Sequence, residues 1–212
     1  MLTTLTRTET STLIDGPTGK LEVALSAPTE KPRRGFAVVC HPHPLHGGNM
    51  HNKVVTTLVR LFQHLGLYTV RFNFRGVGQS EGFFDEGRGE VKDLLAVIDW
   101  VRLEHPDIDV WLAGFSFGSF VAAQAALDLP VKQLVTVAPP VEHFPMRSLP
   151  PILCPWVVVQ GELDEVVPPA AVFDWAEHRN PKPTLIRLPK ADHFFHGQLQ
   201  LLRAELEAVL KG

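Results

Sequence analysis

Cysteine is scarce in this sequence: only Cys40 and Cys154 occur among its 212 residues. Each lies in or beside an apolar run, which favours two buried free thiols over a structural disulfide bridge. Free thiols are typical of a reducing compartment, so we expect the protein to be cytoplasmic.

The chain also lacks an excess of positive charge. Its formal net charge is −3 at pH 7, with 20 Lys and Arg residues against 23 Asp and Glu residues. Binding to nucleic acid or to an anionic membrane surface requires clustered Lys and Arg. The one basic cluster, EKPRRG at 30–35, is short and proline-flanked, and we interpret it as a loop. The composition therefore predicts neither a nucleic-acid partner nor a membrane partner.

No apolar stretch approaches the roughly 20 residues that a membrane-spanning helix requires. Residues 1–15 alternate threonine with apolar residues and have neither a basic start nor a continuous apolar core. A secretory signal would have both. We therefore expect neither a signal peptide nor a membrane segment.

What the sequence does contain is an alternation of strand and helix patterns over the length of one domain, 1–212. Two strand-like segments between residues 2 and 27, separated by the turn DGPTG at 15–19, predict an antiparallel pair at one sheet edge. Beyond them, short apolar strands alternate with helical periodicity, which predicts an α/β fold: a mostly parallel central sheet with helices on both faces. The expected strands are 35–41, 67–74, 109–116, 132–140, 155–161 and 183–189, and the expected helices are 54–65, 91–103, 117–129, a segment after Pro168 and Pro169, and 198–210.

One serine stands where an expected strand meets an expected helix. Ser116 is the centre of Gly-Phe-Ser-Phe-Gly at 114–118, which is followed by a nearly all-apolar helix. Gly-x-Ser-x-Gly in this context is typical of a nucleophile elbow, a turn so sharp that the serine backbone is strained and its flanking residues must be small. The elbow would also direct the backbone N–H of Phe117 at an oxyanion forming on a substrate carbonyl. The alternative is that the glycines and the serine only make a tight turn.

A nucleophilic serine needs a base to accept its proton and an acid to orient that base. In a fold with such an elbow, the acid comes next in the chain, after a later strand. The segment ELDEVVPP at 162–169 follows an expected strand, and we assign Asp164 as the acid, with Glu162 in reserve. Alternatively, these carboxylates only cap the helix that begins near Pro168.

The base is expected last in the chain order. The segment KADHFFHG at 190–197 follows the last expected strand, and we assign His193 as the base because it is the first histidine of this loop. His196 is the reserve. The alternative is a surface histidine in a turn.

From residue 35 to the C-terminus the chain resembles the α/β-hydrolase superfamily, and within it the small, lidless hydrolases related to dienelactone hydrolase and to acyl-peptidase-like serine hydrolases. The matching stretches are VVCHPHPLHGGNMHNKVV, FNFRGVGQSEG, AGFSFGS, VVVQGELDEVVP and ADHFF. The resemblance implies Ser116 as the nucleophile, Asp164 as the acid and His193 as the base. Dienelactone hydrolase itself uses a cysteine nucleophile, so its specific activity is not carried over.

The loop CHPHPLHGGNMH contains four histidines: His41, His43, His46 and His51. Their spacing could supply ligands to a catalytic zinc ion, which would make the chain a metallohydrolase. Two prolines stiffen the loop, and no carboxylate or cysteine with ligand spacing follows it. We therefore expect no metal and no other cofactor.

The resemblance gives this loop another role, because at this place the superfamily usually carries His-Gly and then the residue whose backbone N–H is the second oxyanion donor. Here Pro42 replaces the glycine, and neither Pro42 nor Pro44 has an N–H to give. By register, the second donor is the N–H of His43, with Leu45 as the fallback.

A second loop, FNFRGVGQSEG at 72–82, also resembles a superfamily loop. We expect Arg75 to fix it through hydrogen bonds and assign it no part in catalysis.

The short segment 141–149 offers little lid, which predicts an open cleft for small or flexible acyl substrates. Six phenylalanines could give this cleft apolar walls, although for any single one a place in the core is the better expectation. They are Phe83, Phe84, Phe117, Phe144, Phe194 and Phe195.

Together these features predict a serine hydrolase that transfers the acyl group of a small carboxylic ester, thioester or amide to water through an acyl-enzyme. Ester chemistry is favoured over peptide chemistry, because no acidic cluster is placed to bind a substrate amine. The rival of another class is a catalytically inactive binding module on the same fold, since fold does not imply activity. We expect a monomer or a homodimer.

Overall fold

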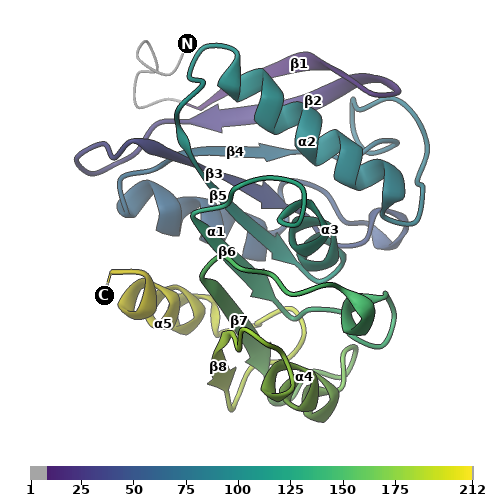
Figure 1. The fold of residues 1–212 in the computed structure, drawn as a ribbon, viewed down its shortest axis with the longest axis vertical. Coiled ribbons are helices and arrows are strands. Elements are labelled where there is room, and N and C mark those ends of the chain that lie inside the picture. Colours follow the sequence, from purple (N-terminus) through teal and green to yellow (C-terminus); the bar gives the residue numbers. More distant parts are fainter. Residues whose placement is uncertain (1–8, 212) are drawn as a thin grey trace.

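The strands of the protein lie side by side in one twisted sheet. The computed structural model describes residues 9–211, and within them eight strands pair in the order β1-β2-β4-β3-β5-β6-β7-β8 (Figure 1). Inner strands such as GFAVVC and WVVVQG are buried along their whole length, which explains why they read as continuous apolar runs. The strands are β1 Thr10–Gly16, β2 Gly19–Ser26, β3 Gly35–Cys40, β4 Tyr68–Phe72, β5 Asp109–Phe115, β6 Gln133–Val137, β7 Trp156–Gly161 and β8 Thr184–Leu188.

The antiparallel part of the sheet is at one edge, as predicted. β1 and β2 form a hairpin in which Gly16 pairs with Gly19, and β2 pairs antiparallel with β4. From β4 to β8 every neighbouring pair is parallel. The part of the first expected segment at 2–8 lies outside the described residues.

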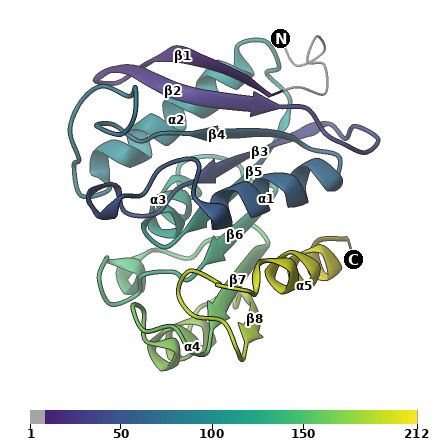
Figure 2. The same cartoon turned by 180° about the vertical axis from the view of Figure 1, so that it is seen from behind.

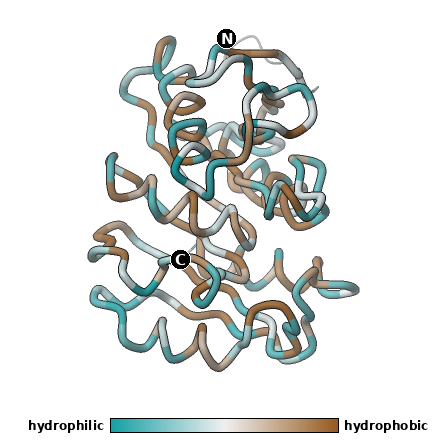
Figure 3. The backbone as a smooth tube through the Cα atoms, turned by 90° about the vertical axis from the view of Figure 1, so that its right-hand side faces the viewer, coloured by the Kyte–Doolittle hydropathy of each residue, from teal (hydrophilic) through white to brown (hydrophobic). Residues whose placement is uncertain are grey.

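Helices cover both faces of the sheet, which confirms the predicted α/β architecture (Figures 1 and 2). One hydrophobic core cluster lies under α2, α3 and α4, and a second lies under α1 and α5. The helices α1, α2 and α5 each bury one apolar face against these clusters, and hydrophobic and hydrophilic residues are interspersed along the backbone (Figure 3). The helices are α1 Lys53–His64, α2 Arg88–Arg102, α3 Phe117–Ala125, α4 Pro169–Glu177 and α5 Leu199–Lys211, with short 3-10 turns at η2 Pro44–His46 and η3 Met146–Ser148.

One helix is shorter than its apolar pattern predicts. The expected helix at 117–129 ends as α3 at Ala125. Leu127 and Asp128 donate their backbone N–H groups three residues back, so the last turn tightens before Pro130. The apolar pattern continues because Leu127 and Leu129 still pack against the core.

The connection between β6 and β7 runs over residues 138–155, and its regular structure among the described residues is the 3-10 turn η3 alone. It contains no α-helix that could form a lid over the carboxyl ends of the parallel strands. Among residues 9–211, no helix is long and apolar enough to cross a membrane. Both cysteines are free: Cys40 is buried and Cys154 is half-buried.

A buried ion pair fixes the loop that follows β4. The Arg75 guanidinium donates to both carboxylate oxygens of Asp93 on α2, at 2.7 and 3.0 Å, and to the Gly89 carbonyl at 2.8 Å. The two side chains are 7% and 0% exposed. The prediction that Arg75 fixes this loop through hydrogen bonds is confirmed.

A buried histidine joins the loops after β3 and β4. His41 Nε2 accepts the backbone N–H of Phe74 at 3.1 Å, and His41 Nδ1 lies 2.6 Å from the Pro42 carbonyl. These partners fit a neutral ring with its proton on Nδ1. Burial lowers the pKa of His41 to about 4, although the hydrogen bond to Pro42 opposes this shift.

We expect Asp93→Ala to destabilise the protein by about 3–5 kcal/mol, because it leaves the Arg75 charge buried without its partner. The matched control is Asp107→Ala, which breaks an ion pair with Arg34 whose side chains are 72% and 82% exposed. That change should cost less than about 1 kcal/mol. Urea unfolding followed by tryptophan fluorescence measures both, and equal losses would contradict a structural role for Arg75.

Acid should weaken the fold through His41. Its pKa is about 4 in the folded chain against 6.5 when unperturbed, so below pH 6.5 the unfolded state binds more protons and stability falls as the pH falls towards 4. By pH 5 this loss is roughly 2 kcal/mol. His41→Gln keeps an acceptor for Phe74 without a titrating ring. Urea midpoints at pH 7.5 and 5 should therefore differ less in the variant, and the same difference in both proteins would refute the assignment.

Candidate active site

The backbone at Ser116 is strained in the way that a nucleophile elbow requires. Ser116 stands between the end of β5 and the first residue of α3, with φ +53° and ψ −120°, a conformation that side-chain-bearing residues rarely adopt. Its N–H donates to the Val137 carbonyl of β6 at 2.8 Å. The side chain thereby stands at the carboxyl edge of the sheet.

Both glycines of the motif lie so close to neighbouring backbone that no side chain fits at either position. A Cβ atom on Gly114 would lie 2.0 Å from the Gly118 carbonyl oxygen, and one on Gly118 would lie 2.4 Å from the carbonyl oxygen of Cys40 and 2.6 Å from that of His41. No larger residue fits at either place without moving backbone. The predicted reason for the Gly-x-Ser-x-Gly spacing is confirmed.

Ser119 also braces this turn, and the sequence reasoning missed it. Its buried hydroxyl lies 2.7 Å from the Gly114 carbonyl and 2.9 Å from the Val137 carbonyl, and it accepts the Val137 N–H at 3.1 Å. The sequence did offer a sign of this role: Ser119 is a hydroxyl residue in a mostly apolar helix, and a polar group buried there needs hydrogen-bond partners.

The structure brings His193 to Ser116. His193 follows β8, and its Nε2 lies 3.2 Å from the Ser116 hydroxyl oxygen. Its Nδ1 lies 2.8 Å from a carboxylate oxygen of Asp164. The ring is nearly buried between the rings of Phe115 and Phe194, with centroids 5.2 and 5.1 Å away. The chain Ser116–His193–Asp164 is thus continuous in hydrogen bonds, with Nε2 towards the serine.

Asp164 is held by four donors. One oxygen accepts the N–H groups of Val166 and Val167 at 2.9 and 2.7 Å, and the other accepts from Gln160 Nε2 at 3.0 Å and from His193. Burial alone would raise the pKa of the Asp164 carboxyl, but the hydrogen bonds from His193, Val167 and Gln160 outweigh it and hold this pKa below its usual value. Gln160, on β7, was not singled out from the sequence.

The two reserve residues lie elsewhere. Glu162 pairs with Arg187 at 2.9 Å. His196 pairs with Asp192 at 2.7 Å, and its side chain is 70% exposed. The structure brings neither of them to Ser116.

The expected oxyanion donors are on adjacent elements. Phe117 is the first residue of α3, where backbone N–H groups have no partner within the helix. The His43 ring packs on the Phe117 ring, with centroids 5.2 Å apart. Among the described residues the His43 N–H donates to no acceptor, whereas the N–H of the fallback, Leu45, donates to His43 Nδ1 at 3.2 Å.

The four histidines of this loop have separate surroundings. His41 is buried in the contacts described above, His43 and His46 stack with centroids 4.4 Å apart, and His51 Nδ1 lies 3.2 Å from Arg71. Burial first, and then the charge of His46, lower the pKa of His43. Within residues 9–211, no three His, Cys, Asp or Glu side chains are grouped so that they could hold a metal ion.

The phenylalanines divide into core and surface residues. Phe117 and Phe195 are fully buried, and the half-buried Phe84 and Phe144 pack on the Phe117 ring at 5.6 and 5.1 Å. Phe83, in contrast, is 89% exposed. Phe194 is also exposed, at 45%. The expectation that any single one lies in the core is therefore wrong for Phe83, in the loop after β4, and for Phe194, in the loop after β8.

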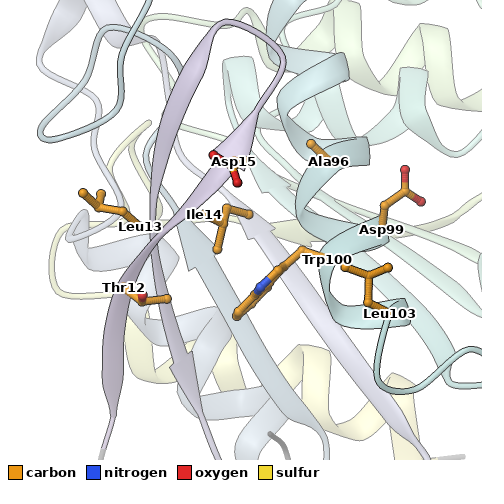
Figure 4. A pocket seen from close by; sticks show the side chains of 8 residues that line it. All are labelled: Thr12, Leu13, Ile14, Asp15, Ala96, Asp99, Trp100 and Leu103. Carbon is orange, nitrogen blue, oxygen red and sulfur yellow. The ribbon is translucent and has the colours of Figure 1, made fainter.

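A hollow of about 580 Å³ lies between β1 and α2, lined by Ile14, Asp99, Trp100 and Leu103 among others (Figure 4). In the sheet, β2, β4 and β3 stand between β1 and β5. This hollow is therefore remote from Ser116.

Known proteins resemble this chain over almost its full length. An α/β serine hydrolase homologue from Coxiella burnetii is 48% identical, with a TM-score of 0.92, and the match covers 95% of this chain and 97% of that one. A Xanthomonas campestris protein described as an α/β serine hydrolase without a lid is 44% identical, also with a TM-score of 0.92, over 98% of this chain and 96% of that one. An uncharacterized protein of Rickettsia prowazekii (strain Madrid E) is 36% identical over 191 residues, which are 85% of this chain and 80% of the relative.

A family model described as serine aminopeptidase, S33, matches residues 37–153, more than half of the chain. This segment contains the elbow at Ser116 and the loop at His43. The similar structures extend the likeness to the segments that carry Asp164 and His193. The chain is therefore a hydrolase of the α/β-hydrolase superfamily and belongs to the serine aminopeptidase S33 family.

Proposed function

We propose that the protein hydrolyses a carboxylic ester, thioester or amide through an acyl-enzyme, with Ser116 as nucleophile, His193 as base and Asp164 as acid. The observation that carries this proposal is the hydrogen-bonded chain from the Ser116 hydroxyl through His193 to Asp164, built on a strained elbow. A serine that only made a tight turn would not need a buried histidine and carboxylate aligned with it.

The first half of the reaction forms the acyl-enzyme. His193 Nε2 takes the hydroxyl proton as Ser116 Oγ bonds to the substrate carbonyl carbon, and the carbonyl oxygen becomes an oxyanion held by the N–H groups of Phe117 and His43. Asp164, ionised and held by its donors, stabilises the imidazolium that results. The intermediate then collapses, and Nε2 gives its proton to the departing alcohol, thiol or amine.

The second half repeats these steps with water. His193 Nε2 takes a proton from water as its oxygen attacks the acyl carbon, and the collapse of the second intermediate returns that proton to Ser116 Oγ and releases the carboxylic acid. Every group in the cycle belongs to the chain itself. The proposal therefore requires no metal and no cofactor.

Esters are favoured over peptides with a free N-terminus. An aminopeptidase needs a carboxylate that is free to bind the substrate amine. Glu162 is paired with Arg187, and Asp192, beside His193, is paired with His196, so neither is available for that role. Glu165, directly after Asp164, is exposed and is the carboxylate that an aminopeptidase would have to use here. Location in the cytoplasm, a single domain over 1–212 and a monomeric or homodimeric state stay predictions from the sequence.

A fluorophosphonate probe should label the wild type at Ser116 and should label neither Ser116→Ala nor His193→Ala. The same two changes and Asp164→Asn should lower kcat/KM for 4-nitrophenyl acetate by at least about 10³-fold. Glu162→Gln and His178→Ala are matched controls with exposed or paired side chains, and they should stay close to wild type. A folded wild type that is not labelled would favour the inactive binding module instead.

The role of the His43 N–H can be tested by removing only that group. His43 has φ −54°, which suits proline, so His43→Pro should fold while losing the donor. His43→Ala, which loses the ring but keeps the N–H, is the control. We expect kcat to be about 10²–10³-fold lower in His43→Pro than in His43→Ala. If His43→Pro and His43→Ala have the same urea midpoint and the same kcat, the His43 N–H is not the second oxyanion donor, and another residue must supply it.

A further inference from the structure

We propose that the hollow between residues 47–53 and 194–199 binds the leaving group of the substrate, and that this leaving group is anionic. The hollow has a volume of about 510 Å³. The inference rests on the proposed function, since it names the substrate class that the same site would select.

The walls of this hollow continue directly from two groups of the candidate site. One wall contains Gly47 and Asn49, a few residues after the oxyanion donor His43, and the other begins at Phe194, the residue after His193. The Phe194 ring stands at 87° to the His193 ring, with the centroids 5.1 Å apart. Phe194 therefore lines the hollow and contacts the His193 ring, which places the hollow one side chain away from the imidazole.

This position determines whether the hollow would bind the acyl group or the leaving group of the substrate. His193 Nε2 must reach the departing atom to protonate it, so the group attached to that atom lies beside the histidine loop. The acyl half must then lie on the other side of Ser116. There His43, Phe84 and Phe144 gather around Phe117, with ring centroids 5.1 to 5.6 Å from that ring. The acyl side is thus aromatic, whereas the leaving-group side is polar.

The polar lining supplies hydrogen-bond donors and one uncompensated charge. Lys53, the first residue of α1, is an exposed side chain of this lining, and its ammonium group makes no hydrogen bond or ion pair with the described residues. The other ionisable groups at this wall are already paired: His196 with Asp192, and His51 with Arg71, which in turn binds Glu9.

Asn52 adds a further donor to the same wall. Its side-chain oxygen accepts the Val54 N–H at 2.8 Å, which leaves its amide N–H groups for a ligand. A free ammonium with an adjacent amide donor favours a negatively charged group. The preferred substrate is accordingly an ester with an apolar acyl group and an anionic leaving group.

Two acetate esters with the same acyl group test this inference: 3-acetoxybenzoate, which is anionic, and 3-acetoxybenzamide, which is neutral. The quantity measured is the ratio of kcat/KM for the anionic ester to that for the neutral ester. In Lys53→Met this ratio should fall about three- to tenfold at low salt, and in Lys53→Glu it should fall further. The matched control is Lys132→Met, since Lys132 is exposed at the opposite end of the sheet, before β6; it should leave the ratio unchanged.

The rate on the neutral ester separates the two proposals. If the wild type cleaves 3-acetoxybenzamide and the ratio does not respond to Lys53, the anionic leaving-group site is refuted while the serine hydrolase stands. If the folded wild type cleaves neither ester but is labelled by the fluorophosphonate probe, this inference alone fails. If it cleaves neither ester and is not labelled, the proposed function fails and this inference fails with it. A ratio that falls equally in Lys53→Met and Lys132→Met would reflect the overall charge of the protein and would also overturn the site.

Discussion

The close approach of three backbone segments at Ser116 is the constraint on which the site depends. The end of β3, the end of β5 and the start of α3 meet so tightly that a single added carbon at Gly114 or Gly118 would overlap a carbonyl oxygen. This contact fixes the serine in a conformation that costs free energy. It also sets the distance between Ser116 and the loop that carries His43. The proposed nucleophile, Ser116, and one proposed oxyanion donor, His43, are therefore positioned by the same packing.

Strain is concentrated where the parallel strands end. The non-glycine residues with positive φ in the described chain are Glu86, Ser116, Ala138 and Phe195, and each follows a different parallel strand at the carboxyl edge. Such conformations persist only where the surroundings determine them fully. Buried hydrogen bonds supply that support here, through Arg75 and Asp93 in one loop and Ser119 beneath the elbow. The buried contacts of the core thus hold the strained residues at this edge of the sheet in fixed positions.

Much of this could be predicted from the sequence because the signals are local. Alternating strand and helix patterns gave the sheet and its two helical layers, and the order of serine, acid and histidine gave the three residues that the structure brings together. Ser119 and Gln160 were missed because a sequence pattern does not show which buried polar groups meet: Ser119 bonds to Val137 on β6, and Gln160 reaches Asp164 only because the turn after β7 folds back on it. The exposure of Phe83 likewise depends on how its loop is folded. Local pattern determines the elements, whereas contacts between distant segments determine which polar side chains support the site.

The aligned groups come from widely separated parts of the chain: Ser116 and His193 are 77 positions apart. The elbow needs only β3, β5, β6 and α3, but the imidazole reaches the serine only when β7 and β8 have joined the sheet in register. A chain whose last two strands are displaced would keep a well-formed turn around an unreactive hydroxyl. Under the proposed function, reactivity at Ser116 would consequently report on whether the last two strands of the sheet are assembled, and so on whether folding is complete.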